Sequence, residues 1–260
     1  GQHNTGATYA LSLSGSTSIT AGTGVTLESL NDNTGTIALL SSGGINGGSG
    51  TVLMRAANYA FGGADRTITT TGVLTIEPDA DENSFASSFD NQYLNPVSVT
   101  GLTLGKSSNA SAITLSRAIS LSGPVSIYGG SIDVNANITA NSGNILLDAD
   151  TGSTLNQSST GILLDDAITI ETVTSGNLTL IGRSGDTGSG FDGIDASSAN
   201  TTTLRSAGNL TLQGYSYAAS GSGRGVDLNN DVIAASGTVS MTGQHNTGAT
   251  YALSLSGSTS

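Results

Sequence analysis

The sequence contains no cysteine and no tryptophan, and only three prolines and four phenylalanines among its 260 residues. Without cysteine, neither a disulfide nor a thiolate-bound metal can support the fold. Only 10% of the residues are charged, against about 25% in a typical soluble domain. Chains this poor in charge can be disordered, but aliphatic pairs recur throughout this one and can bury a core. We therefore expect an ordered, all-β protein.

Basic side chains are especially scarce. Seven lysines and arginines face nineteen aspartates and glutamates, which gives a formal net charge of −12. A chain with this charge is repelled by phosphate backbones, so we expect it to bind neither nucleic acid nor anionic membranes. No segment approaches 18 consecutive apolar residues, and we expect no insertion into a membrane.

Repetition is the main feature that the sequence does have. Residues 1–18 and 243–260 both read GQHNTGATYALSLSGSTS. We interpret residues 1–242 as one repeat unit and 243–260 as the start of the next identical unit. The chain is then expected to be a window on a longer tandem array. A unit of this length far exceeds the roughly 20–50 residues usual in repeat proteins, which predicts a finer repeat inside it.

The finer repeat is marked by glycine. Glycine recurs before an aliphatic-x-aliphatic pattern, and cutting the chain there gives nine units that together fill positions 1–242 without remainder. Examples are GVTL at 24–27, GLTL at 101–104, GNILL at 143–147 and GNLTL at 176–180 and 208–212. Longer units carry their extra residues between the first and second aliphatic pairs, where loops can protrude without disturbing a stack.

The shortest unit, residues 123–142, predicts the fold. Its aliphatic side chains form three short period-2 strands, at Val125 and Ile127, Ile132 and Val134, and Ile138. Three strands per turn, repeated about nine times, predict a parallel β-helix, or β-solenoid, with aliphatic side chains inside and polar ones outside. At about 4.8 Å per coil the unit would advance roughly 43 Å. A β-sandwich is the rival fold, but it does not explain the closing glycine period.

One segment, residues 77–94, departs from this pattern. It gathers Phe85, Phe89 and Tyr93, whose spacing predicts one face of a short helix, and it is a candidate for lateral contact or partner binding. The alternative is a solvated loop whose aromatic side chains pack back on the solenoid wall. The segment also holds oxygen ligands of the kind that Ca²⁺ uses, at Asp79, Asp81 and Glu82.

A second acidic stretch at 185–195 supplies further calcium candidates, Asp186, Asp192 and Asp195. Residues 188–194 match the calcium-binding nonapeptide pattern of β-roll proteins once. That pattern works by tandem repetition, so an ordinary loop is the competing interpretation of a single copy. No other metal or cofactor is indicated.

Catalytic chemistry is not indicated either. Enzymes built on parallel β-helices need paired carboxylates across a groove or acidic residues clustered with basic ones. Here the six arginines are scattered, and the one unique histidine is His3, repeated as His245. We therefore predict no catalytic residues and no enzyme activity.

The segments SGNLTLIG, SGNILLDA, AGNLTLQG and SGTVSMTG, with ALSLSGSTSITAGTG, resemble bacterial exoproteins of the filamentous haemagglutinin type. These are large, repetitive surface adhesins. The resemblance implies a right-handed parallel β-helix and an extracellular location on a bacterial surface. Adhesin shafts of this type have divergent repeats, whereas in this chain the segment at 1–18 recurs at 243–260 without a single change. That departure favours a structural role.

Two functions follow as hypotheses. The first is a building block of a long extracellular filament or stalk, in which β-solenoid repeats stack end to end and the partner is a further copy of the same unit. The second is an adhesin shaft that binds a glycan or a protein through its excursions at 77–94 and 181–195.

Overall fold

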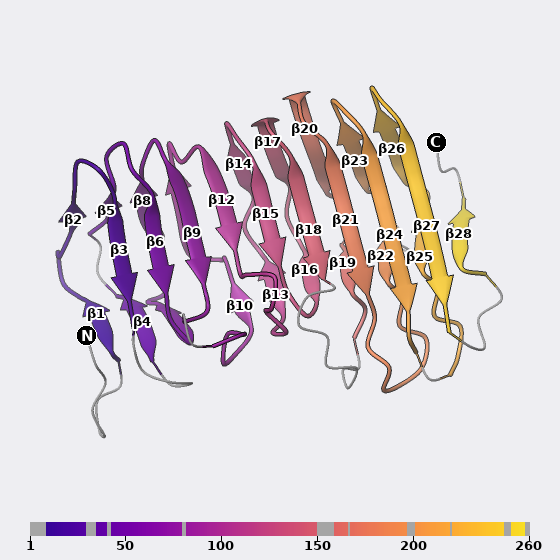
Figure 1. Ribbon diagram of the computed structural model, residues 1–260, viewed down its shortest axis with the longest axis horizontal. Coiled ribbons are helices and arrows are strands. Elements are labelled where there is room, and N and C mark those ends of the chain that lie inside the picture. The colour runs from indigo at the N-terminus through magenta and orange to yellow at the C-terminus, as the bar shows by residue number, and fades with distance from the viewer. Residues whose placement is uncertain are drawn as a thin grey trace.

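The alternation of aliphatic and polar residues produces short strands throughout the chain. In the computed structural model these strands coil into a stack that runs from the N-terminal end to the C-terminal end (Figure 1). Every pairing between the named strands is parallel, and the described residues contain no helix. The structure describes residues 9–29, 35–40, 43–79, 82–149, 159–165, 167–196, 201–218, 220–246 and 251–257.

One wall of the stack, which we call the long face, is a single nine-stranded sheet. It takes the first strand of each coil, and the aliphatic-x-aliphatic pattern after each glycine lies on it. Its strands are β3 (Val25–Glu28), β6 (Val52–Arg55), β9 (Val73–Glu77), β12 (Gly101–Leu104), β15 (Val125–Tyr128), β18 (Ile145–Ala149), β21 (Leu178–Arg183), β24 (Leu210–Ser216) and β27 (Val239–His245).

The second face takes the next strand of each coil and consists of two sheets. The first sheet contains β1 (Leu11–Leu13), β4 (Thr36–Leu39) and β7 (Asn58–Phe61). The second contains β10 (Phe89–Asp90), β13 (Ile113–Leu115), β16 (Ile132–Val134), β19 (Ile162–Leu164), β22 (Ile194–Ala196), β25 (Val226–Asn229) and β28 (Leu253–Ser256).

The third face closes each coil and is also divided in two. Its first sheet contains β2 (Ile19–Thr20), β5 (Ile45–Asn46), β8 (Arg66–Thr69) and β11 (Leu94–Val97). Its second contains β14 (Ile119–Leu121), β17 (Ile138–Ser142), β20 (Thr169–Ser175), β23 (Thr203–Ser206) and β26 (Val232–Ala235).

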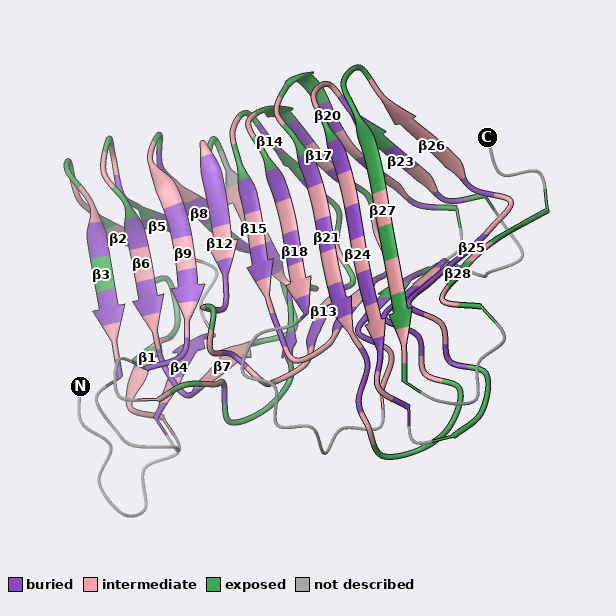
Figure 2. Ribbon diagram, turned by 45° about the vertical axis from the view of Figure 1, so that its right-hand side comes forward, coloured by how far each residue is buried: buried purple, intermediate pink, exposed green. Residues whose placement is uncertain are grey.

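The core consists of aliphatic columns that run along the stack. On the long face, Val125 is paired with Ile145 and Ile127 with Leu147, and all four side chains are buried. The residues between them point outward, which gives the alternating burial visible along these strands in Figure 2. Because a lone coil could not bury its inner face, each coil is stable only against its neighbours.

The recurring glycines lie at the corner before the long face, next to the backbone of a neighbouring coil. Gly176 has a φ of 112°, and a Cβ on it would lie 1.9 Å from the carbonyl oxygen of Gly143 in the preceding coil. Only glycine fits such a corner. The predicted all-β parallel solenoid is confirmed, and the nine strands of the long face match the nine predicted units.

Candidate functional site

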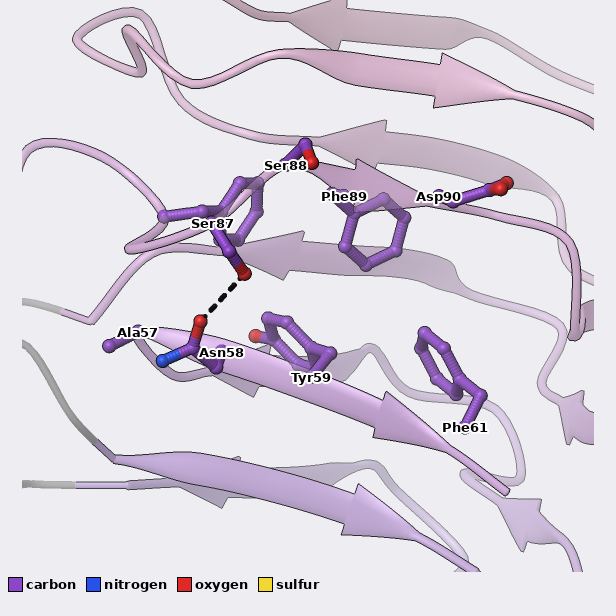
Figure 3. Close-up of a pocket in the computed structure, with 9 residues that line it drawn as sticks. Ala57, Asn58, Tyr59, Phe61, Ser87, Ser88, Phe89 and Asp90 are labelled. Carbon is purple, nitrogen blue, oxygen red and sulfur yellow. Dashed lines mark hydrogen bonds between the residues drawn. The ribbon is translucent and has the colours of Figure 1, made fainter. Parts of the chain in front are cut away.

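The second face is interrupted before segment 77–94 and the third face after it. Within the described residues, no strand pairing joins β7 to β10 or, one coil further on, β11 to β14, whereas the long face is paired from β6 through β9 to β12. Two hydrogen bonds still cross the gap on the second face. The Ala86 N–H donates to the Ala57 carbonyl oxygen at 2.8 Å, and the Ser87 hydroxyl donates to Asn58 Oδ1 at 2.8 Å (Figure 3).

Four aromatic rings line this break on the second face, around a pocket, and we call them the aromatic seal. Tyr59 and Phe61 come from β7, and Phe89 comes from β10 on the other side (Figure 3). Phe85 precedes β10 in segment 77–94. Phe85 and Phe89 stack with their centroids 5.5 Å apart, and Tyr59 meets both edge to face at 5.8 and 5.7 Å. Such contacts stabilise beyond the area they bury. Ring packing thus replaces the missing backbone ladder.

Tyr59 anchors the seal to the long face. Its hydroxyl donates a hydrogen bond shared between the carbonyl oxygens of Met54 and Glu77, at 2.8 and 2.9 Å. Burial raises the pKa of Tyr59 well above its usual value, so the group stays a neutral donor. These two carbonyl oxygens belong to β6 and β9, so the tyrosine holds the interrupted face against the continuous one.

The prediction of a helix through Phe85, Phe89 and Tyr93 is wrong. The described part of segment 77–94 has no helix; Phe89 opens β10 and Leu94 opens β11. Phe85 and Phe89 are each only 4% exposed, so they pack inward, as in the alternative interpretation. Of the three contact candidates, Tyr93 alone keeps a half-buried side chain. A spacing of four residues is also compatible with a chain that enters a strand with both rings turned inward.

The calcium candidates in this segment do not converge. Asp79 is buried, and its carbonyl oxygen accepts hydrogen bonds from Lys106 Nζ at 3.0 Å and from the Glu82 N–H at 3.1 Å. Among the described residues, neither Asp79 nor Glu82 belongs to a group of three acidic or histidine side chains close enough to hold one ion. Asp81 lies outside the described residues.

The second acidic stretch does converge, with one member that sequence reasoning missed. Carboxylate oxygens of Asp192, Asp195 and Asp227 lie within 4.8 Å of one another; Asp186 is not part of this acidic cluster. Asp195 and Asp227 are paired in register between β22 and β25. They are separated along the chain by one coil, so comparing equivalent positions of successive coils would have found Asp227.

The acidic cluster already contains a cation. The Arg224 guanidinium is paired with the Asp227 carboxylate, and the Arg224 backbone N–H donates to Asp192 Oδ1. Burial raises the pKa of Asp192 to about 6, and Asp195 and Asp227 add to the rise, while the hydrogen bond from the Arg224 N–H opposes it. The Gly193 N–H also donates to the Arg224 carbonyl oxygen at 2.9 Å. The cluster thus fastens two successive excursions to each other.

A ladder of asparagines along the glycine corner was also missed. The backbone N–H of Asn177 donates to Asn144 Oδ1 at 2.8 Å, and the N–H of Asn209 donates to Asn177 Oδ1 at 2.8 Å. The Thr238 N–H continues the ladder to Asn209 Oδ1 at 2.9 Å. These side chains satisfy backbone donors that the sheet leaves free at its corner. The recurring Gly-Asn pair before aliphatic residues was the signal for it.

The two ends of the stack carry unpaired strand edges. Within the described residues, β3, β1 and β2 end their sheets on the N-terminal side, and β27, β28 and β26 on the C-terminal side. Exposed aliphatic side chains gather at the C-terminal end, where β27 is largely exposed in Figure 2. They include Val239, Leu253 and Leu255, which are 42%, 37% and 53% exposed. An open, aliphatic sheet edge is a template for another chain.

Comparisons with protein families, with curated proteins and with solved structures returned no match to this chain. The described residues include no helix long and apolar enough to cross a membrane. The interpretation of function therefore depends on the geometry of the stack, its aromatic seal and its two open ends.

Proposed function

We propose that this chain is a structural building block of a long extracellular filament or stalk on a bacterial surface, formed by β-solenoid repeats stacked end to end. The observation that carries the proposal is the long face, a ladder of nine parallel strands that reaches both ends of the stack without a break. The resemblance to filamentous haemagglutinin-type exoproteins supports the location.

The mechanism would be mechanical. Each coil is held to the next by backbone hydrogen bonds on at least two of its three faces and by stacked aliphatic columns, so an added repeat would extend one continuous rod. The aromatic seal and the acidic cluster fasten longer excursions to the wall. A charge of −12 per chain would keep neighbouring rods apart and soluble.

Cryo-electron microscopy of the native material tests this function. A filament would give a meridional reflection near about 4.8 Å and an axial repeat of roughly 43 Å, the spacing expected from nine coils. Short isolated particles that lack the longer repeat would contradict the filament.

An adhesin shaft is the second candidate, and the placement of the excursions favours it. The longer excursions between the long face and the second face lie along one edge of the stack (Figure 1). Where two of them begin, at the ends of β21 and β24, Arg183 lies over the rings of Tyr215 and Tyr217, with its guanidinium carbon 5.8 and 5.2 Å from their centroids. Aromatic faces along one edge could contact a glycan. Binding of the isolated chain to a glycan array would support the adhesin, and its absence would favour the filament.

A further inference from the structure

The duplicated segment of the chain is seen in two different settings. Residues 11–13 form β1, whose next neighbour in the stack is β4, while the identical residues 253–255 lie in β28, whose preceding neighbour is β25. One and the same sequence therefore shows which strand precedes it and which strand follows it.

Placing one copy of the segment on the other joins two stacks in a defined register. In β28, Leu253 is paired with Val226 and Leu255 with Leu228. In β1, the identical positions are paired with Ile37 and Leu39. The combined columns read Val-Leu-Ile and Leu-Leu-Leu, so each position of the duplicated strand has an aliphatic partner on both sides. No inward side chain of this strand would meet a charged or polar one.

The long face continues in the same register. The first aliphatic residue after the corner is Val25 in β3 and Val239 in β27. With β27 under β3 of the next copy, Val239 would meet Val25 and Met241 would meet Leu27. The outward residues Ser240 and Thr26 would lie side by side.

The third face adds the pair β26 and β2, which makes the junction complete. The long face and the third face each contribute one strand from each side, whereas the second face offers β28 and β1 for a single place. In a continuous tandem chain the duplicated segment occurs once per junction and fills it. Between two separate chains, one of the two identical strands would have to leave its sheet so that the other can take its position.

We propose that the open C-terminal end binds the N-terminal end of a second copy of this chain in this register, with the duplicated segment as the shared strand. The inference depends on the proposed filament, and it adds which residues meet at the junction. A second copy of this chain is the partner that fits the C-terminal end, because the duplicated strand already pairs with β25 on one side and with β4 on the other.

Cysteine cross-linking tests the junction, because the chain has no cysteine of its own. The full-length T26C/S240C variant places one thiol on each end of the long face. Both positions are exposed and neutral, and within one molecule they lie at opposite ends of the nine-stranded sheet. A disulfide can therefore form only between copies. The matched control is T26C/T242C, which moves one thiol by two positions on the same outward side.

In the proposed register, Thr26 and Ser240 of adjacent copies lie one strand apart, about 4.8 Å, within disulfide reach. Thr242 would lie diagonally at about 8 Å, beyond the roughly 7 Å limit. Mild oxidation should convert T26C/S240C into a series of covalent multimers, with several-fold less product from T26C/T242C. Single-cysteine variants can give only dimers. Circular dichroism of each variant checks that it folds.

Electron microscopy of the same samples separates the two proposals. Long rods with equal cross-linking in both double variants would overturn the register and leave the filament intact. Samples that form neither rods nor multimers at high concentration would overturn both. Preferential cross-linking of T26C/S240C in rods would support both.

Discussion

Neighbouring leucines on β19 allow the solenoid core to be tested with a matched pair of substitutions. Leu164 is fully buried and is paired with Val134 of the preceding coil. Leu163 points outward and is 38% exposed. The substitution Leu164→Ala removes the same atoms as Leu163→Ala, one residue along the same strand. Any difference between the two variants therefore reports burial and not composition or strand propensity.

The expected cost of Leu164→Ala is about 3 kcal/mol, in the middle of the range for a buried leucine, because the coils on either side hold the cavity walls in place. For Leu163→Ala we expect less than about 1 kcal/mol. In a stack, stability is a sum of coil terms and nearest-neighbour terms, so the loss should stay near β19.

Hydrogen exchange measured by mass spectrometry resolves both the size and the place of this effect. A loss of about 3 kcal/mol should accelerate exchange about 100-fold in β16, β19 and β22, which are adjacent in the sheet. Strands at the far end, such as β3, should exchange at the original rate. Equal acceleration in both variants, or acceleration spread evenly over the chain, would refute the argument.

Three further predictions concern particular residues. The pKa of Asp192 is raised from 3.8 to about 6. The free energy of unfolding should therefore fall by up to about 3 kcal/mol as the pH rises from about 4 to above 6. Asp192→Asn should flatten that fall, and an unchanged pH profile in this variant would contradict the prediction. Gly176→Ala should lower stability by on the order of 2 kcal/mol or more, whereas Gly22→Ala should be tolerated, because a Cβ there meets nothing within 4 Å. Urea denaturation measures both variants, and similar midpoints would argue against the tight corner at Gly176. Phe89→Ala should cost about 3–5 kcal/mol, and thermal melting should show a smaller loss for Tyr93→Ala; the reverse order would dismiss the aromatic seal.

The coils could be predicted because one physical rule governs each of them. In the unit that begins at Gly123, period-2 alternation sends Val125, Ile127, Ile132 and Val134 inward, and all four are buried. The glycine corner could be predicted as a recurring mark. Its cause, the approach of Gly176 to the backbone of the preceding coil, required the stacked geometry.

Contacts between coils were harder to find, because they depend on how much chain lies between equivalent positions. Asp227 joins Asp192 and Asp195 only when the coil length at that level is known. The interruption between β7 and β10 has a different origin. It depends on the volume of Phe85 and Phe89 packed against Tyr59. The spacing of residues along the sequence carries no information about side-chain volume. The same spacing therefore predicted a helix where the chain forms none.

The interruptions in two of the three walls, one coil apart, give the stack a preferred direction of bending. Between β7 and β10, opening the second face separates aromatic rings and a few hydrogen bonds, while β6–β9 on the long face and β8–β11 on the third face keep their backbone ladders. One coil further on, between β11 and β14, the third face is interrupted while the long face and the second face stay paired. Within the described residues the long face alone is paired at both levels, so it acts as a hinge line, and the edge between the other two faces is the compliant side. In a tandem array this joint would recur once in every copy of the repeat unit, always at the same level. Such a filament would flex through evenly spaced, directional joints and would resist twisting and extension between them.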